Sequence, residues 1–317
     1  MRSVRCLITL AAVAALSASA NAQDTKVAIA ISGWTGFAPL TLANEAGLFK
    51  KNGLDVTIKK IPQKDRHLAI ASGDVQCAAT TVETWVSWNA NGVATTQIFQ
   101  LDKSYGADGL VVKPGIAKIA DLKGKTVAAS APGTAPYFGL AWILKKNGLS
   151  VKDVKVLTLE PQPVANAMIA GTTDFDGGMT YEPYLSAVRA KPEAGKIIAT
   201  TLDYPMVMDT FGCAPKFLKE NPKAAKALAD SYFDALDMIK KDPKKSFEIM
   251  GADVKQSGEA FEKSQAYLRW QDRAANQAFF AGEHQAFTKE AADLLLEIGT
   301  IKQIPDLKSL ADTSFIK

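Results

Sequence analysis

The chain has 317 residues, of which 47% are hydrophobic and 22% charged, and its formal net charge is +4. These values are typical of a soluble globular protein and exclude a disordered or fibrous chain. A chain of this length usually folds as two domains, because single hydrophobic cores stop growing at about 250 to 300 residues.

The first 22 residues have the pattern of a cleavable secretory signal. Arg2 and Arg5 precede an apolar run over residues 7–16, and Ala20-Asn21-Ala22 fits the small-residue cleavage site. The apolar run is shorter than the roughly 20 residues that a membrane helix needs. We therefore expect a signal peptide at residues 1–22, cleavage after Ala22 and a free periplasmic protein.

The mature chain is nearly neutral and carries two cysteines. Without Arg2 and Arg5, 35 Lys and Arg face 33 Asp and Glu, which argues against nucleic acid or an anionic membrane as a partner. Cys77 and Cys213 could pair in an oxidising compartment. Two separate buried thiols are the alternative, and the sequence leaves both open.

An internal repeat organises the chain. The sequence KKNGL at residues 50–54 recurs at residues 145–149, and each copy follows an apolar run, a loop with Gly and Pro, and a helical stretch. Further on, Thr81-x-Glu83 recurs 99 residues later as Thr180-x-Glu182. Both copies predict strand, turn, helix, strand. This order is typical of an α/β protein with mostly parallel sheets flanked by helices.

In chain order, the first copy predicts a strand at residues 27–31, a helix at 40–51 and a strand at 54–58. The second copy predicts a strand at residues 127–130, a helix at 137–146 and a strand at 154–159.

After Pro215 the sequence predicts an all-helical tail, because apolar residues recur at helical spacing over residues 224–240, 243–250, 257–268 and 283–298. The chain crosses between the copies twice. We expect one lobe of residues 23–104 plus 212–317, which includes the tail, and a second lobe of residues 105–211.

Catalytic motifs are incomplete. Gly124-Lys125-Thr126 resembles the end of a phosphate-binding loop, but Ile119 stands where that loop needs a glycine. The two histidines, His67 and His284, lack the spacing of a zinc helix, and no Gly-x-Ser-x-Gly elbow occurs. We therefore expect no cofactor, no metal and no enzymatic activity. A periplasmic enzyme that uses His67 is the alternative, and turnover by the purified protein would distinguish the two.

Four loops fall beyond the carboxyl ends of predicted strands, where α/β sheets bind ligands. GWTGFAP at residues 33–39 and SAPGTAPY at 130–137 offer backbone N–H groups to an anion. TTVETW at residues 80–85 and MTYEPY at 179–184 offer hydroxyls and a carboxylate, which could cap a helix or accept from a ligand. The candidate ligand-binding residues are Trp34, Thr35, Phe37, Thr81, Glu83, Trp85, Ser130, Thr134, Tyr137, Tyr181 and Glu182.

Several of these motifs together resemble a known family. GWTGFAP at residues 33–39, EAGLF at 45–49, ASGD at 71–74, DLKGKTVA at 121–128 and YEP at 181–183 look like the periplasmic substrate-binding proteins of ABC importers of the nitrate/sulfonate/taurine type. The resemblance implies a type II periplasmic-binding-protein fold, a hinged two-lobe trap and an ABC permease as partner. It also implies ligand contacts from Trp34, Thr35, Thr81, Glu83, Thr134 and Glu182. Tyr181 stands where many members have Trp, which leaves the shape of the ligand open.

The expected function is that of a monomeric receptor that closes on one small molecule. Helix N-termini favour a sulfonate, nitrate or carboxylate, whereas Glu83 and Glu182 favour a solute with an amine or a heteroaromatic nitrogen. A zwitterion such as taurine satisfies both requirements. A sensor that binds the same ligand is a further alternative that the sequence does not separate from an importer subunit.

Overall fold

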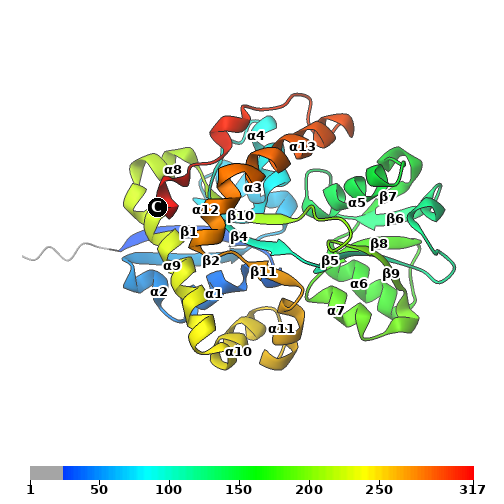
Figure 1. Cartoon of the computed structure of the whole chain (residues 1–317), viewed down its shortest axis with the longest axis horizontal. Coiled ribbons are helices and arrows are strands. Elements are labelled where there is room, and N and C mark those ends of the chain that lie inside the picture. The colour runs from blue at the N-terminus through cyan, green and yellow to red at the C-terminus, as the bar shows by residue number, and fades with distance from the viewer. Residues whose placement is uncertain (1–23) are drawn as a thin grey trace, which may run out of the picture.

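The computed structural model describes residues 24–317, so the expected signal peptide at residues 1–22 lies outside the described residues. Two β-sheets form two lobes that lie side by side along the long axis of the molecule (Figure 1). The first sheet has six strands in the order β11-β4-β10-β3-β1-β2, and the second has five in the order β7-β6-β8-β5-β9. No helix among residues 24–317 combines the length and apolar character needed to cross a bilayer.

The strands of each sheet run in both directions. The first sheet contains β1 (Thr25–Ile31), β2 (Leu54–Lys60), β3 (Cys77–Thr81), β4 (Thr96–Ser104), β10 (Met208–Cys213) and β11 (Leu268–Trp270), and the second contains β5 (Asp108–Val112), β6 (Thr126–Ala129), β7 (Lys155–Thr158), β8 (Gly177–Tyr181) and β9 (Lys196–Thr200). β1 is parallel to β2 and β3, and β6 is parallel to β7 and β8, whereas β4, β5, β9, β10 and β11 form antiparallel pairs. The two-lobe α/β architecture is confirmed. The sheets are mixed rather than mostly parallel, because the strands that enter or leave a lobe run against their neighbours.

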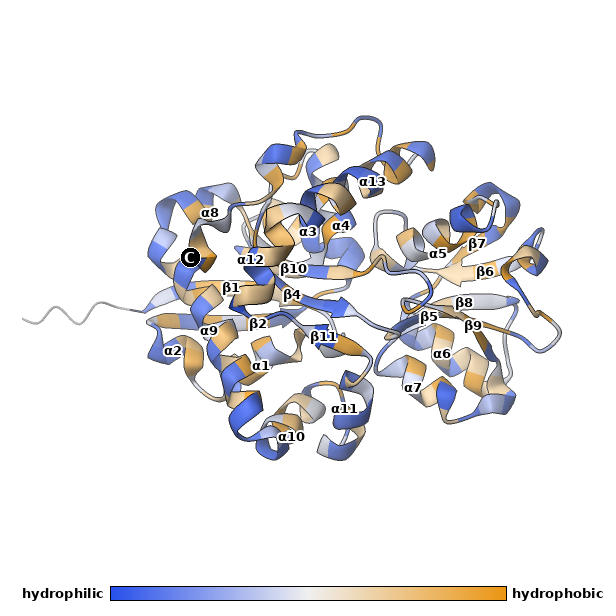
Figure 2. Ribbon diagram, in the orientation of Figure 1, coloured by the Kyte–Doolittle hydropathy of each residue, from blue (hydrophilic) through white to orange (hydrophobic). Residues whose placement is uncertain are grey.

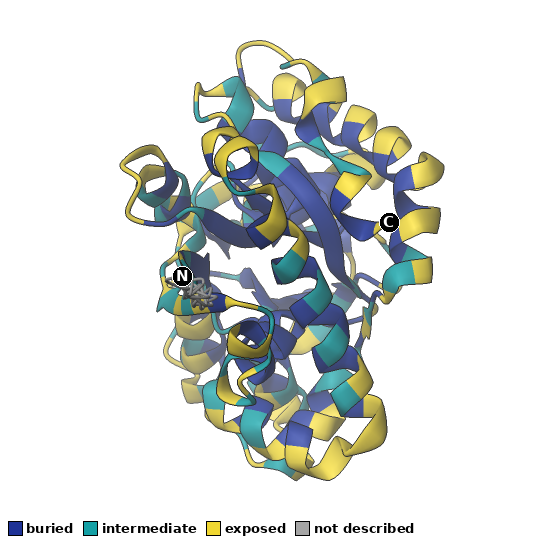
Figure 3. Ribbon diagram, turned by 90° about the vertical axis from the view of Figure 1, so that its left-hand side faces the viewer, coloured by how far each residue is buried: buried dark blue, intermediate teal, exposed yellow. Residues whose placement is uncertain are grey.

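Helices flank both sheets. They are α1 (Ala38–Glu45), α2 (Leu48–Lys51), α3 (Gln63–Ala71) and α4 (Val82–Ala90) in the first lobe, α5 (Ala135–Lys146), α6 (Pro161–Ala170) and α7 (Tyr184–Arg189) in the second, and α8 (Pro215–Glu220), α9 (Pro222–Lys241), α10 (Pro243–Asp253), α11 (Gly258–Gln265), α12 (Arg273–Ala278) and α13 (His284–Glu297) in the tail. Apolar and polar stretches alternate along them (Figure 2), and their exposed residues face outward while the strands are mostly buried (Figure 3). In α9, for example, Leu228, Tyr232, Ala235 and Ile239 are buried at helical spacing.

The internal repeat is confirmed by the topology. The strand order β2-β1-β3 of the first sheet recurs as β7-β6-β8 in the second, and in both cases the central strand is parallel to its neighbours. In both copies a helix ends at Asn-Gly, where Gly53 and Gly148 have φ values of 77° and 73°. A residue with a Cβ is strained in this left-handed conformation, so glycine ends these helices at low cost.

The C-terminal tail is not entirely helical. The helix expected over residues 257–268 ends at Gln265, and Leu268–Trp270 forms β11, which pairs with the edge of β4 that faces away from β10. The expectation was wrong here because a three-residue strand is too short to show a period of two. Its conformation is fixed by hydrogen bonds to β4 rather than by its own sequence.

The second crossing between the lobes runs through β10. This strand pairs with β4 from Met208 to Cys213 and with β3 from Asp209 to Cys213, and both partners belong to the first sheet. The boundary predicted between residues 211 and 212 therefore falls inside a strand of the first sheet. The remaining boundaries predicted for the two lobes stay predictions.

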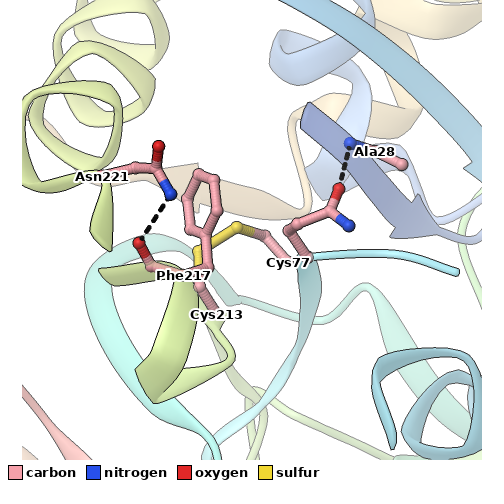
Figure 4. The surroundings of a disulfide bond; sticks show 6 residues. Ala28, Cys77, Cys213, Phe217 and Asn221 are labelled. Carbon is pink, nitrogen blue, oxygen red and sulfur yellow. Dashed lines mark hydrogen bonds between the residues drawn. A yellow bond between two sulfur atoms is a disulfide. The ribbon is translucent and has the colours of Figure 1, made fainter. Parts of the chain in front are cut away.

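A disulfide joins Cys77 to Cys213. The two residues are directly opposite each other on β3 and β10, and the bond lies next to Phe217 of α8 (Figure 4). The sequence had left open whether these residues pair or remain separate thiols, and in the structure they pair. The bond attaches the strand that returns from the second lobe to the centre of the first sheet.

Removing this cross-link should destabilise the mature protein. Cys77 and Cys213 are 136 residues apart, so the disulfide restricts the unfolded chain strongly. We expect the double variant Cys77→Ala, Cys213→Ala to lose about 2 to 5 kcal/mol in the free energy of unfolding, measured by urea denaturation. Wild-type protein in reducing agent should lose a similar amount. An unchanged urea midpoint in both samples would contradict this expectation.

Candidate functional site

Two adjacent cavities lie where the loops of the two lobes meet. An inner cavity of about 30 Å³ and an outer cavity of about 260 Å³ share Ser32, Gln63 and Tyr181 in their walls. Ser32 follows β1, Gln63 begins α3, and Tyr181 ends β8 of the second lobe. The site is therefore built at the carboxyl ends of strands from both lobes, as the sequence predicted.

Several candidate residues from the sequence line these cavities. Trp34, Phe37, Thr81 and Tyr181 line the inner cavity, and Ser130 and Tyr181 line the outer one. The ring of Trp34 packs edge-to-face on that of Tyr181, with 5.4 Å between centroids. These two rings form an aromatic wall of the inner cavity that joins the two lobes.

Other candidates lie behind the walls of the cavities. Trp85 is buried and donates from Nε1 to Thr210 Oγ1 at 2.7 Å, so it belongs to the core. Thr134 is buried and donates to the Ala131 carbonyl at 2.7 Å, while Tyr137 is half-buried and lines neither cavity. These residue types are suited to a ligand site. In the structure, however, Trp85 and Thr134 donate to partners within the protein, and Tyr137 lines neither cavity.

The two glutamates chosen from the repeat are both buried, and neither lines a cavity. Glu182 accepts from Arg189 and, at 3.1 Å, from the backbone N–H of Ser186 in the first turn of α7, so both of its oxygens have partners within the second lobe. Glu83 accepts a hydrogen bond from Thr81 through Oε1, and its Oε2 has no partner. Glu83 therefore acts on a ligand only through Thr81 or through its charge.

The lobes touch around the cavities. The backbone N–H of Ala135 in the second lobe donates to Gln63 Oε1 at 3.2 Å, and the backbone N–H of Thr35 donates to the Glu182 carbonyl at 3.4 Å. The Thr35 side chain is buried without a hydrogen-bond partner. These two hydrogen bonds join facing loops of the two lobes.

Arg66 supplies the positive charge of the inner cavity. Its side chain is only 1% exposed, and it donates from Nε to the Ile61 carbonyl at 2.9 Å and from Nη1 to the Ala79 carbonyl at 2.6 Å. Its Nη2 has no partner. Burial lowers the pKa of Arg66 to about 10, so the group is still charged at neutral pH. A fixed, charged N–H donor is thus available to whatever enters the cavity.

Carboxyl groups surround the same cavity. Asp108 of β5 and Asp209 of β10 line it, and Asp102 of β4 lies opposite Asp209 and accepts from Trp34 Nε1 at 3.3 Å. Burial raises the pKa of Asp108 to about 7 and the pKa values of Asp102 and Glu83 to about 8. Burial, together with the neighbouring Asp102, raises the pKa of Asp209 well above its usual value.

Sequence reasoning did not identify the most strongly charged part of the site. By sequence, Lys64 and Arg66 are possible anion partners, with a surface charge the expected role of each. In the structure Lys64 is exposed and pairs with Asp65 at 2.8 Å, whereas Arg66 is buried. Asp108 and Asp209 were not chosen because they lie in strands rather than in the repeated loops. A detectable signal was present: each is a single charge in an apolar strand, and an isolated charge on a buried strand needs a partner.

Neither histidine belongs to the site. Burial lowers the pKa of His284 to about 4, and its Nε2 lies 3.2 Å from Gln97 Oε1. His67 lies against the ring of Trp88, and neither histidine lines the two cavities. Among residues 24–317 no three His, Cys, Asp or Glu side chains are grouped to hold a metal ion.

Comparisons with known proteins agree with this architecture. The model of a family described as NMT1/THI5 like matches residues 34–246. The chain belongs to this family. It is 29% identical to the taurine-binding periplasmic protein of Escherichia coli K12 over 71% of this chain and 69% of that protein.

Solved structures show the same fold at low identity. The alkanesulfonate-binding protein SsuA from Xanthomonas axonopodis pv. citri superposes with a TM-score of 0.76 at 17% identity, covering 92% of this chain and 99% of that one. The desulfurization enzyme DSZB superposes with a TM-score of 0.65 at 15% identity, covering 92% of this chain and 97% of that one. The fold therefore accommodates both binding proteins and an enzyme, so the function of this chain has to be inferred from the residues of its site.

The buried carboxyl groups should make the stability of the solute-free protein depend on pH. Their folded pKa values lie above the ordinary values, so the native state holds more protons than the unfolded state between about pH 5 and 8. The stabilisation that these extra bound protons provide is complete at low pH and is lost as the pH rises through the folded pKa values. We expect the free energy of unfolding to fall from pH 5 to 9, by at most about 1.4 kcal/mol per pH unit for each group.

The measurement is urea denaturation of the mature protein at each pH. Asp108→Asn should show a smaller fall than the wild type, because the variant cannot lose this proton. Asp55→Asn, which changes an exposed carboxylate on β2, should show the same fall as the wild type. A free energy of unfolding that rises over this pH range would contradict the expectation.

Proposed function

We propose that this chain is the periplasmic solute-binding protein of an ABC importer and captures a small polar or anionic molecule of the sulfonate, taurine or nitrate class. The observation that carries the proposal is Arg66, which lines a cavity between the two lobes and whose charged Nη2 has no hydrogen-bond partner in the protein. The family, and a relative named for binding taurine in the periplasm, support the same assignment.

The arrangement of the lobes supports a trap that closes on its solute. Residues of both lobes line the cavities, so a solute contacts both lobes only when they are together. A ligand that makes contacts in the closed state alone shifts the population toward that state. The closed protein then presents a surface composed of both lobes, which a permease can distinguish from the open one.

A binding role agrees better with the site than an enzymatic one. Nucleophilic catalysis needs a base within hydrogen-bond reach of a nucleophile, and neither histidine lines the cavities. Glu83 accepts from the hydroxyl of Thr81, which lines the inner cavity, but burial raises the pKa of Glu83 to about 8, so at neutral pH this carboxyl group is mostly protonated and is a poor base for that hydroxyl. We propose a monomer that is exported with cleavage after Ala22 and acts without a cofactor.

Binding should depend on Arg66. We expect Arg66→Gln to weaken binding of a small sulfonate by at least 10-fold, because a charged hydrogen bond contributes about 1.5 to 3 kcal/mol. Isothermal titration of the mature protein with alkanesulfonates, taurine and nitrate provides the measurement. Lys64→Gln, which changes a nearby exposed cation, is the matched control and should bind as the wild type does. Equal affinity in Arg66→Gln, with the fold intact by circular dichroism, would refute the role of Arg66.

A further inference from the structure

The first turn of α5 receives no cap from the residue that precedes it. Thr134 uses its hydroxyl to donate to the Ala131 carbonyl at 2.7 Å, and its side chain accepts from no N–H of the helix. An N-cap Thr usually accepts such a bond, because the first N–H groups of a helix have no partner within it. Pro136, the second residue of α5, has no N–H, so the first N–H that needs an acceptor is that of Ala135.

The acceptor for Ala135 comes from the first lobe. Its N–H donates to Oε1 of Gln63, the first residue of α3, at 3.2 Å. The loop that leads into α5 approaches the first lobe closely, since a Cβ on Gly133 would lie only 2.8 Å from Ser87 Oγ of α4. The N-terminus of a helix of the second lobe is thus packed on the first lobe and capped by a side chain from it.

Bonds within the first lobe hold the amide group of Gln63 in place. Its Nε2 donates to Thr80 Oγ1 at 2.7 Å and to Thr84 Oγ1 at 2.9 Å. A side-chain amide has two N–H donors, so both are used within the first lobe and the oxygen is left for Ala135. The opposite orientation of the amide would place its NH2 group against the Ala135 N–H, donor against donor.

The same hydroxyls connect this contact to the inner cavity. Thr84 Oγ1 lies 2.9 Å from Thr81 Oγ1, and Thr81 lines the inner cavity. Gln63 and Ala135 line this cavity as well. A hydrogen bond between the lobes and the wall of the candidate site therefore belong to one network, in which the position of one group influences the others.

The ion pairs between the lobes differ from this contact. Lys145 and Lys146 of α5 pair with Glu297 and Glu290 of α13, but exposed ion pairs contribute little to stability. None of these four side chains lines either cavity. They can hold the lobes together, but they have no contact with a solute.

We propose that Gln63 is a positioning residue that stabilises the closed state of the protein by capping α5 of the opposite lobe. This inference rests on the proposed function and names a residue that couples closure of the lobes to solute capture. When the lobes separate, the N–H of Ala135 and the amide oxygen bind water instead. The bond should therefore change the ratio of closed to open protein by about 2- to 10-fold, as expected for one net hydrogen bond.

The first measurement is amide hydrogen exchange at Ala135, followed by NMR in the mature protein with and without taurine. An amide that is hydrogen-bonded in the closed state alone exchanges when the lobes open, so its protection reports the bond. We expect Gln63→Met, which keeps the length of the side chain but removes its amide, to speed this exchange by about 2- to 10-fold. Exchange at Val164, whose N–H donates to the Glu160 carbonyl at 3.1 Å within the second lobe, should not change.

The second measurement is isothermal titration with taurine, ethanesulfonate and nitrate. The apparent affinity for a solute scales with the fraction of protein in the state that binds it. Gln63→Met should therefore weaken the binding of each solute that the wild type binds by the same factor of about 2 to 10. A side chain that acts by contacting the solute would instead change the ratios between the solutes.

Two further variants assign the effect to the acceptor on Gln63. Gln63→Glu retains an oxygen for the Ala135 N–H, so this amide should remain protected. Gln303→Met makes the matched substitution at an exposed position and should behave as the wild type in both measurements. Far-ultraviolet circular dichroism and urea midpoints verify that each variant is folded.

The outcomes separate this inference from the proposed function. Equal exchange at Ala135 in the wild type and in Gln63→Met, with and without taurine, would overturn the inference and leave the receptor function intact. Affinity losses that differ among the solutes, or fast exchange in Gln63→Glu as well, would also overturn it. A wild-type protein that binds none of the three solutes would overturn the proposed function, and exchange in the solute-free samples would then decide whether Gln63 caps α5.

Discussion

The antiparallel pairing of β10 with β3 and β4 is the constraint on which the site depends. It brings the chain back from the second lobe into the middle of the first sheet, and it places Asp209 opposite both Thr81 and Asp102. At the other end of the same strand, the disulfide fixes Cys213 against Cys77. The position of Asp209 in the wall of the cavity therefore follows from backbone hydrogen bonds and a covalent bond rather than from loops.

Burying the charged side chains of the site has an unfavourable free energy of desolvation, and this free energy links the stability of the fold to solute binding. Carboxyl groups surrounded by low-dielectric protein remain protonated or find a cation, and Arg66 already donates to two backbone carbonyls. A solute whose polar or charged groups form hydrogen bonds with these buried side chains offsets part of that desolvation free energy. Since the solute binds the folded state alone, the free energy released at the site also stabilises the fold.

The sequence was sufficient to predict the repeat, the two lobes and the cavity at the carboxyl ends of the strands, because strand and helix periods and Asn-Gly helix ends are local signals. Trp34 and Tyr181 could be chosen since they lie in the repeated loops. Asp108 and Asp209 could not, because their role depends on which strands become neighbours, and that follows from the return of β10. The brief strand β11 and the location of Trp85 in the core depend in the same way on tertiary contacts.

The order of the strands along the chain also has a consequence for how the molecule assembles. The second sheet uses a continuous segment from β5 to β9, whereas the first sheet needs β10 and β11, and a bridge between Gln97 and Ala311 attaches the end of the chain to β4. Phe315 and Ile316 are buried there. During synthesis from the N-terminus, the second sheet has all its strands once residue 200 has been made, while the first needs residue 270 to complete β11 and residue 311 to form the bridge to Gln97. Loss of a few C-terminal residues would thus damage the lobe that contains the N-terminus.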